Sequence, residues 1–567
     1  MKRALILATA MAIAAAGASA QAPGAADADA PRFKLTDTGG LLADGKPLLP
    51  IIVWAQPSSL LEYYKGLGVN TMHPGESEEK DPIKAYLDKL QAAGMYALVN
   101  LAAYKDEIKS HPAVVAWTVE HEPDMASEPA YEPDLSGEAA IVWIEAESAK
   151  TNTLNRSPWL EGSKPALSGK QCVGTQALEG QLTWEFQVKT AGKYNLWVRE
   201  FTHTWANPTV WSLNGAAEQT TPRVLPVKDN TNLGGGRGVG WSPYGQVELK
   251  AGSNTLTFKP GKGRTLGKGD KVDPNAVIWA VDAICFTTAD SYPPAKKLEP
   301  LPTRLPEVEK ANYEKVKKLM PGALTWNILG AGFFGPYQKS YKLPMRYYGE
   351  FLKWADITSF DHYPVTGWNK PDRLPEVGLA TRKLVSLARK GQPVWTIIEA
   401  SDQDLSWTAK ETRGPNAAEM RAEAYMAIAN GAKGLGYFTI AFEPFRWKNL
   451  TPEVEAEMKR TNGELTELAG PIVLGDTAKK LTISGDETKD AAAAGHAIQA
   501  IRKEYQGKTY VIAVNVTREA AKPTFTLADP PAGAKAAVWK TDRTVEIKDG
   551  AFTDELAPLA VRVYVIE

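Results

Sequence analysis

Hydrophobic and polar positions divide the chain into regions with two different periods. From residue 32 to 132 and from 294 to 472, short continuous apolar runs alternate with segments whose apolar residues recur at helical spacing. Continuous apolar runs are typical of strands buried on both faces of a parallel sheet. From about 133 to 293, and again after 472, apolar and polar residues alternate with a period of two between Gly/Asn/Thr turns. This second pattern predicts antiparallel β-sandwiches.

Four strand-and-helix units precede the interruption and four follow it. Eight such units over about 290 residues predict a (β/α)8 TIM barrel, and thus an α/β fold. A doubly wound sheet is the alternative, but no Gly-rich phosphate fingerprint follows the first strand. The predicted barrel strands are Leu48–Trp54, Val69–His73, Tyr96–Leu101, Val114–Val119, Ala323–Leu329, Ile357–Phe360, Val394–Ile398 and Gly434–Ile440.

The first residues have the features of a signal peptide. Lys2 and Arg3 precede an apolar stretch, and Ala18-Ser19-Ala20 is an A-x-A cleavage site. We therefore expect residues 1–20 to be removed after Ala20, residues 21–31 to form a flexible leader, and the protein to be secreted or periplasmic. No later segment is long and apolar enough to predict a membrane span.

Composition narrows the function classes. The chain has 567 residues with 65 Lys+Arg and 66 Asp+Glu, a balance that argues against a nucleic-acid binder. Its 2 Cys exclude a disulfide-rich scaffold and a Cys-based zinc site. Its 17 Trp outnumber its 14 Phe, and the flat indole face suits either stacking on sugar rings or filling a core.

Carboxylates end two of the predicted barrel strands, where active sites of such barrels are built. The fourth strand runs into Glu120, Glu122 and Asp124, and the seventh ends at Glu399. Glycosidic cleavage needs a pair of carboxyl groups. Glu120 and Glu122 share a strand face, so alternation does not separate them. Glu399 could instead be a structural ion-pair partner, although burying a carboxylate without a role is costly.

The run His111–Trp117 leading into Glu122-Pro123 resembles the fourth strand of the glycoside hydrolase superfamily called clan A. In that clan a Glu before Pro is the general acid/base, and a Glu ending the seventh strand is the nucleophile. The resemblance therefore implies these roles for Glu122 and Glu399 and covers about half of the chain. It departs at one point, because His121 stands where the clan usually has an Asn that bonds the sugar's 2-hydroxyl.

Further candidates for substrate binding lie at strand ends. His73, His121 and His362 could be zinc ligands, but no H-x-H or H-E-x-x-H spacing supports this, so hydrogen bonds to sugar hydroxyls are favoured. The segment Ser359–Pro364 resembles the sixth-strand end of clan A, which implies that Tyr363 bonds Glu399. Candidate stacking platforms, with core packing as the alternative for each, are Trp54, Trp326 and Trp407.

Four segments of the insert resemble carbohydrate-binding modules of families 6 and 35. They begin at Trp143, Thr190, Leu249 and Ala280. The resemblance implies a jelly-roll sandwich at 133–293 that binds glycan, with a rigid spacer as the alternative.

Single residues of the insert take expected roles from the same resemblance. Hard oxygen ligands suit calcium, and a structural calcium would be held by Glu145, Glu147 and Asp282, with a solvated strand edge as the alternative. We expect a disulfide between Cys172 and Cys285, and two buried free thiols are the alternative. Independently of the resemblance, Trp205, Trp241 and Tyr244 lie near Gly, Asn and Pro residues that mark loops, so we expect them to be exposed.

The sequence thus predicts a secreted, modular glycoside hydrolase. Its domains are expected at 32–132 plus 294–472 for the barrel, 133–293 for the insert and 473–567 for a C-terminal β-sandwich. It would cleave O-glycosidic bonds of a poly- or oligosaccharide with retention, using Glu122 and Glu399 and no catalytic cofactor. The alternatives are a non-catalytic glycan-binding protein on a barrel scaffold and a transglycosylase.

Overall fold

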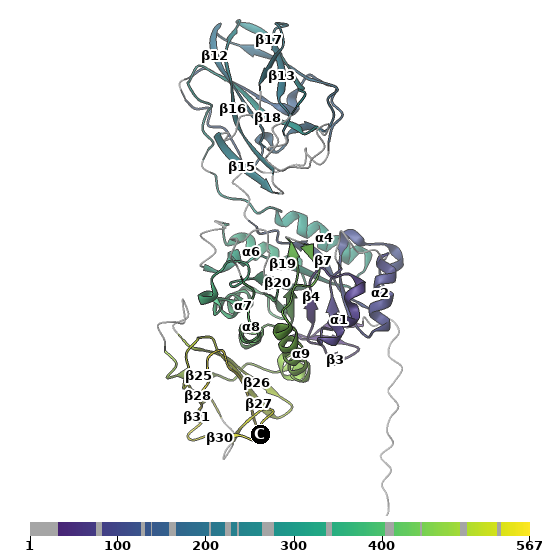
Figure 1. Cartoon of the computed structure of the whole chain (residues 1–567), viewed down its shortest axis with the longest axis vertical. Coiled ribbons are helices and arrows are strands. Elements are labelled where there is room, and N and C mark those ends of the chain that lie inside the picture. Colours follow the sequence, from purple (N-terminus) through teal and green to yellow (C-terminus); the bar gives the residue numbers. More distant parts are fainter. Residues whose placement is uncertain are drawn as a thin grey trace, which may run out of the picture.

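A computed structural model of the chain (Figure 1) provides the structure. It describes residues 32–74, 82–125, 131–137, 139–157, 166–202, 206–221, 228–234, 237–263, 277–296, 298–335, 343–402, 413–442, 445–487, 496–529 and 535–567. The expected signal peptide and leader, together with Trp205 and Trp407, lie outside these residues.

Eight parallel strands close into a barrel, as predicted. Around the barrel β7 is followed by β19, so the chain leaves and re-enters the barrel between neighbouring strands. The predicted α/β barrel is therefore confirmed. Its strands are β4 (Ile51–Val53), β5 (Thr71–Met72), β6 (Tyr96–Asn100), β7 (Val114–His121), β19 (Leu324–Leu329), β20 (Ile357–His362), β21 (Val394–Glu399) and β22 (Leu435–Phe438).

Helices surround the barrel, and their apolar faces cover its strands. They are α1 (Leu61–Gly66), α2 (Ile83–Ala92), α4 (Pro306–Leu319), α6 (Arg346–Phe351), α7 (Glu376–Leu387), α8 (Ala417–Ala429), α9 (Pro452–Glu467) and α10 (Ala469–Leu474). Among the helices that the structure describes, none has both the length and the apolar character needed to cross a membrane.

A small sheet that the sequence did not predict closes the amino end of the barrel. It consists of β1 (Phe33–Leu35), β2 (Leu41–Ala43) and β3 (Lys46–Pro47). Its Phe33 and Leu41 belong to the hydrophobic cluster of the barrel interior, which also contains Trp326 and Trp395. The barrel interior next to this sheet is therefore a packed core.

The insert consists of two antiparallel sheets packed on one hydrophobic core (Figure 1). One sheet contains β8 (Ile141–Glu145), β10 (Val173–Thr175), β12 (Gly192–Phe201), β15 (Lys228–Gly234), β16 (Arg237–Leu249) and β18 (Trp279–Thr287). The other contains β9 (Thr151–Asn152), β11 (Leu182–Val188), β13 (Thr209–Leu213), β14 (Gln219–Thr221) and β17 (Gly252–Pro260).

The two connections between barrel and insert run side by side. Pro133 pairs with Ala295, and the amide of Asp134 donates to the Pro294 carbonyl at 2.8 Å. The insert thus leaves and returns at one point and carries its own core, as expected for a module inserted into a loop.

The expected disulfide of the insert is not formed. Cys172 lies with Leu167 and Val239, whereas Cys285 lies in a separate cluster with Trp197 and Trp241. Val173 pairs with Val281, which places Cys172 opposite Asp282 and about 10 Å from Cys285 along β18. That separation is too long for a disulfide.

The C-terminal region is a second two-sheet sandwich, packed on the barrel helix α8. Ile512 and Val514 of the sandwich belong to the same cluster as Tyr425 and Ile428 of α8. This contact explains why α8 is buried on all sides. The sandwich strands are β25 (Leu481–Ser484), β26 (Ile498–Tyr505), β27 (Lys508–Asn515), β28 (Thr524–Leu527), β29 (Lys535–Val538), β30 (Thr544–Glu546), β31 (Ala551–Thr553) and β32 (Val561–Ile566).

Candidate active site

A cavity of about 480 Å³ opens at the carboxyl ends of the barrel strands. Its size and its mixture of aromatic walls with a few polar groups are those of a small-ligand site. Five residues predicted from the sequence lie in its wall: Trp54, His121, Glu122, His362 and Tyr363. The sequence did not single out the other described lining residues, which are Met125, Ile328, Ala331, Asp361, Trp368, Ile397, Phe438 and Phe442.

Trp54 lies between two of the predicted histidines. Its ring stacks on His73 at 4.0 Å between centroids and on His121 at 4.8 Å. His73 is buried, and burial together with the nearby His121 lowers the pKa of His73 to about 3. A neutral His73 therefore supports the indole from behind, while Trp54 and His121 face the cavity.

The side chains of Glu120, Glu122 and Asp124 lie in different surroundings. Opposite β19, Val119 is an extra residue in β7, a β-bulge. After the bulge Glu120 turns outward and accepts a hydrogen bond from Asn312 of α4 at 3.2 Å. The expectation that Glu120 and Glu122 share a face is wrong, because β7 ends at His121 and Glu122 adopts a left-handed conformation, so strand alternation does not extend to it.

Glu122 has a φ of 46°, a left-handed conformation that is rare outside glycine. Its amide is held by the Ile328 carbonyl at 2.8 Å. Strained residues of this kind concentrate at functional sites.

Asp124, the other alternative to Glu122, lies outside the cavity wall. It is completely buried and accepts a hydrogen bond from the Gly330 amide at 2.7 Å. Burial raises the pKa of Asp124 to about 7. Of the three acids that end the fourth strand, Glu122 alone is among the described residues lining the cavity.

A second carboxyl group faces the same cavity from β20. Asp361 lines the cavity, and the Tyr363 hydroxyl donates a hydrogen bond to it. Burial raises the pKa of Asp361 well above its usual range, and the charge of Glu122 raises it further. The bond expected from Tyr363 to Glu399 thus goes to Asp361 in this structure. The sequence could have pointed to Asp361, because this acid directly follows Phe360, the last residue of the predicted sixth strand.

Glu399 lies at the end of β21, as predicted, but its carboxylate is held within the fold. It accepts hydrogen bonds from the backbone amides of Val365, at 2.6 Å, and Thr366. The carboxyl group of Glu423 of α8 interacts electrostatically with it, and both side chains are buried. Burial raises the pKa of Glu399 to about 7 and that of Glu423 well above its usual range. Glu399 is not among the described residues that line the cavity.

The remaining predicted residues divide between cavity and core. His362 lines the cavity, and its Nε2 lies 3.7 Å from a carboxylate oxygen of Glu376. The centroid of its ring lies 5.1 Å from that of the Trp368 ring, in an edge-to-face arrangement. Trp326 is completely buried inside the barrel, where its indole N–H donates to Ser359 at 2.9 Å. The prediction of Trp326 as a sugar platform is therefore wrong, because its position on β19 points it into the core.

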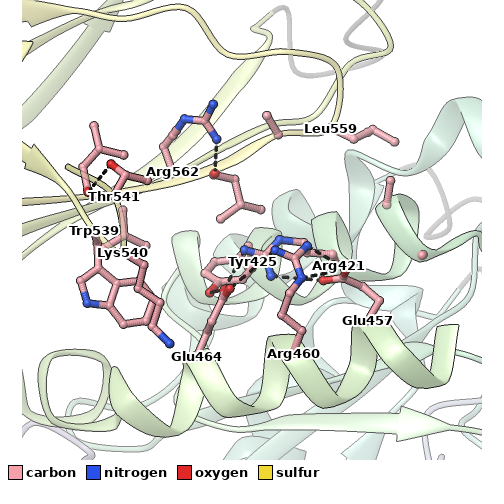
Figure 2. Close-up of a pocket in the computed structure, with 16 residues that line it drawn as sticks. Arg421, Tyr425, Glu457, Arg460, Glu464, Trp539, Lys540, Thr541, Leu559 and Arg562 are labelled. Carbon is pink, nitrogen blue, oxygen red and sulfur yellow. Dashed lines mark hydrogen bonds and ion pairs between the residues drawn. The ribbon is translucent and has the colours of Figure 1, made fainter. Parts of the chain in front are cut away.

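A second cavity, of about 530 Å³, lies between the barrel helices α8 and α9 and the C-terminal sandwich (Figure 2). Its charged groups pair with each other. Arg421 donates to Glu457 at 3.2 Å and to Glu464 at 2.7 Å, and the Tyr425 hydroxyl also donates to Glu464. This cavity lies between the two domains and shares no described lining residue with the cavity at the carboxyl ends of the strands.

Comparison with protein families agrees with this chemistry. The model of glycoside hydrolase family 42, described as beta-galactosidase, matches residues 305–467, which include β19 to β22. The family match confirms the predicted enzyme class, a glycoside hydrolase. A search of the curated proteins found no match.

Solved structures similar to this chain include several carbohydrate-active enzymes. An α-amylase of Geobacillus thermoleovorans in complex with acarbose is 15% identical, with 47% of this chain and 58% of that chain covered and a TM-score of 0.33. A family 27 β-L-arabinopyranosidase of Geobacillus stearothermophilus is 11% identical, with 46% and 54% covered and a TM-score of 0.31. An exo-β-1,3-galactanase of Phanerochaete chrysosporium is 22% identical, with 26% and 29% covered and a TM-score of 0.18. The chain covers less than two thirds of each of these structures.

Proposed function

We propose that this protein hydrolyses O-glycosidic bonds in a poly- or oligosaccharide, with Glu122 as the general acid/base. The observation that carries the proposal is the position of Glu122, which lies at the end of β7 in a cavity lined by aromatic rings and two histidines. Aromatic faces stack on sugar rings and the polar groups orient hydroxyls. The matching family model is described as beta-galactosidase, so β-galactosides are the first substrates to test.

The mechanism we propose retains the configuration of the anomeric carbon. Glu122 gives its proton to the glycosidic oxygen as the bond to the anomeric carbon breaks, and a second carboxylate bonds to that carbon. Water then replaces the carboxylate and returns a proton to Glu122. The sequence gives the second role to Glu399, and its strand-end position supports that assignment. The hydrogen bonds that its carboxylate accepts from two backbone amides count against it.

Hydrolysis of a panel of aryl glycosides, beginning with 4-nitrophenyl β-D-galactoside, tests the function. We expect turnover of at least one glycoside, and proton NMR of the first product should show the anomer of the substrate. The opposite anomer would replace the retaining mechanism by an inverting one. No turnover across the panel would leave a non-catalytic glycan-binding protein, and products built on a concentrated sugar acceptor would indicate a transglycosylase.

Export and glycan binding by the insert belong to the same proposal. The signal-peptide pattern supports secretion, and the intact mass of exported protein should correspond to a chain that begins at Gln21. The jelly-roll resemblance supports glycan binding, but two of the expected platforms are wrong: Trp241 is completely buried, and the Tyr244 hydroxyl is bonded to Glu200 inside the fold. Every aromatic side chain in the described strands of the insert is buried or half-buried.

We also propose a structural calcium in the insert, held by two of the three expected carboxylates, although the described residues contain no group of three or more Asp, Glu, His or Cys side chains placed to bind a metal ion. Glu145 and Glu147 converge on Gly169, where a Cβ would lie 2.3 Å from a Glu147 oxygen and 3.6 Å from the carboxyl carbon of Glu145. The buried Oε2 of Glu145 has no partner among the described residues. Asp282 is instead paired with the buried Arg199. Glu145 and Glu147 would thus hold the ion, and EGTA should lower the melting temperature of the full chain.

A further inference from the structure

We propose that Glu423 of α8 is a positioning residue for Glu399: it keeps its own proton and directs it at the Glu399 carboxylate, so that Glu399 is the acid of the pair that ionises. This inference rests on the proposed hydrolysis, with Glu399 as its nucleophile. Glu423 is not among the described residues that line the cavity, and it exchanges no proton with the substrate. Its effect is to set the pH range in which Glu399 is charged.

The fold places Glu423 in a completely buried position without a cation. Its helix packs against β21, which ends at Glu399. The side chain of Glu423 is 0% exposed, and neither of its carboxyl oxygens has a hydrogen-bond partner among the described residues. The acids that interact with it electrostatically are Glu399 and, on its own helix, Glu419. A charged carboxylate in such a place is costly, so Glu423 is held neutral.

The acid one turn earlier on α8 shows how this fold keeps a buried carboxylate charged. Glu419 is also completely buried, but Arg413 donates to it at 2.6 and 2.8 Å, Arg518 at 2.5 Å, and the Asn416 amide at 2.9 Å. Burial raises the pKa of Glu419, but the bonds from Arg413 and the other donors outweigh it and bring the pKa below its usual value. Glu423 receives no such donors from the described residues.

Within the facing pair, the donors belong to Glu399. Two backbone amides of the loop after β20 donate to its carboxylate. Burial raises its pKa to about 7, while these amides and the Glu423 carboxyl act against that rise. The other titratable groups that interact with Glu399 are Tyr363 and Arg413. Because two facing buried acids do not ionise together readily, the charge lies on Glu399 and the proton on Glu423.

A neutral Glu423 matters for the chemistry because only an ionised carboxylate bonds to the anomeric carbon. A charged neighbour would repel the charge of Glu399 and keep it protonated. Glu399 loses its charge when its oxygen bonds to the anomeric carbon as the leaving group departs, and regains it when water replaces it there. Glu423 stays neutral through both steps.

The test is the pH dependence of kcat/KM for variants of the full chain, on an aryl glycoside that the wild type hydrolyses. The acidic limb of this profile reports ionisation of the nucleophile. Glu423→Gln keeps a donor but cannot ionise, so its limb should stay within about 0.3 pH units of wild type. Glu423→Met has a similar length and no donor, so its limb should move up by about one pH unit, with kcat/KM about tenfold lower on that limb.

Glu309→Gln is the matched control. Glu309 of α4 is an equally buried acid whose pKa burial raises well above its usual range, but Asn327, Glu120 and Asp124 face it instead of Glu399. Its acidic limb should match that of wild type. Glu423→Leu is a second apolar variant in case Glu423→Met does not fold, since exchanging a buried ionisable group for an apolar side chain is often tolerated.

Two results would overturn the inference while leaving the hydrolase intact. An acidic limb that moves to lower pH in Glu423→Gln and in the apolar variants would mean that Glu423 is the charged acid of the pair. A limb that stays in place in all of them would mean that Glu423 only fills space. Absence of turnover by the wild type would instead refute the proposed function on which the inference rests.

Discussion

At the residue scale, the cavity is defined by side chains that the backbone holds in unusual positions. Glu122, with a left-handed φ of 46°, lines the cavity, while Glu120 accepts a hydrogen bond from Asn312 and Asp124 is buried. A left-handed residue with a Cβ costs about 1–2 kcal/mol, which the bond from its amide to Ile328 helps to offset. The sequence shows the acids but not the left-handed conformation that follows the end of β7, so alternation alone could not choose between Glu120 and Glu122.

Glu399 should make stability depend on pH. Burial raises its pKa to about 7 in the folded protein, above the value near 4.3 expected in the unfolded chain. A raised carboxyl pKa contributes stability that is complete below pH 4 and is lost as pH rises toward 7. The difference is on the order of 3 kcal/mol. Glu399→Gln cannot ionise, so its melting temperature should fall less than that of wild type between pH 5 and pH 8.

The matched control for this prediction is Glu62→Gln, which changes an exposed carboxylate on α1. It should reproduce the wild-type pH dependence of the melting temperature. Equal dependence in wild type and in Glu399→Gln would mean that Glu399 is not held protonated in the fold.

At the element scale, the strands were predictable and their ends were not. All eight predicted barrel strands are present, because each is a continuous apolar run between turn residues. A continuous apolar run does not show which residues of a strand face the barrel interior or how high in the barrel they stand. Trp326 could be assigned to core or cavity only once its pairing with Ile357 was known, and Asp361 could be assigned only from its pairing with Ile397.

A short hairpin beside the cavity extends its aromatic wall. It consists of β23 (Ala441–Phe442) and β24 (Phe445–Arg446). Phe442 lines the cavity and lies 6.1 Å from Phe438, and Phe445 is 43% exposed at 6.5 Å from Phe442. These rings form a continuous apolar strip from the cavity to the surface.

Phe445→Ala should therefore weaken oligosaccharide binding more than monosaccharide binding. Loss of one stacking face is worth about 1 kcal/mol, so KM for an oligosaccharide should rise about fivefold, while KM for a single-sugar aryl glycoside stays unchanged. Val385→Ala, which shortens an exposed side chain on α7, is the control and should change neither constant. An equal rise for both substrates would contradict an extended binding strip.

At the scale of the whole molecule, the chain joins a barrel to two sandwiches by different means. The C-terminal sandwich shares a hydrophobic cluster with α8 and adds the ion pair of Arg518 with Glu419 at 2.5 Å. The insert is tied to the barrel by two paired connecting segments. The period of the apolar residues revealed this modular order. The same pattern could not show that the expected disulfide is not formed, because this depends on the register between β10 and β18.

Excision of the insert tests this independence. Because Pro133 and Ala295 are paired, replacing residues 134–294 by a short Gly-Ser turn should leave the barrel folded. The excised protein should keep kcat on aryl glycosides within about threefold, since the described wall of the cavity comes from the barrel, and should lose retardation by polysaccharide in affinity gels. If the excised protein still binds polysaccharide fully, the insert is only a spacer. If the excised protein loses turnover, the insert contributes to the active site.

The central claim is that Glu122 is the proton donor of a glycoside hydrolase, and the leaving-group dependence of Glu122→Gln tests it most directly. A substrate with a good leaving group, such as 2,4-dinitrophenyl, needs little protonation, whereas an alkyl or sugar leaving group depends on it. The account predicts that Glu122→Gln lowers kcat/KM by about a hundredfold or more for the poor leaving group and far less for the good one. Equal loss for both substrates, or near-native rates for both, would contradict it.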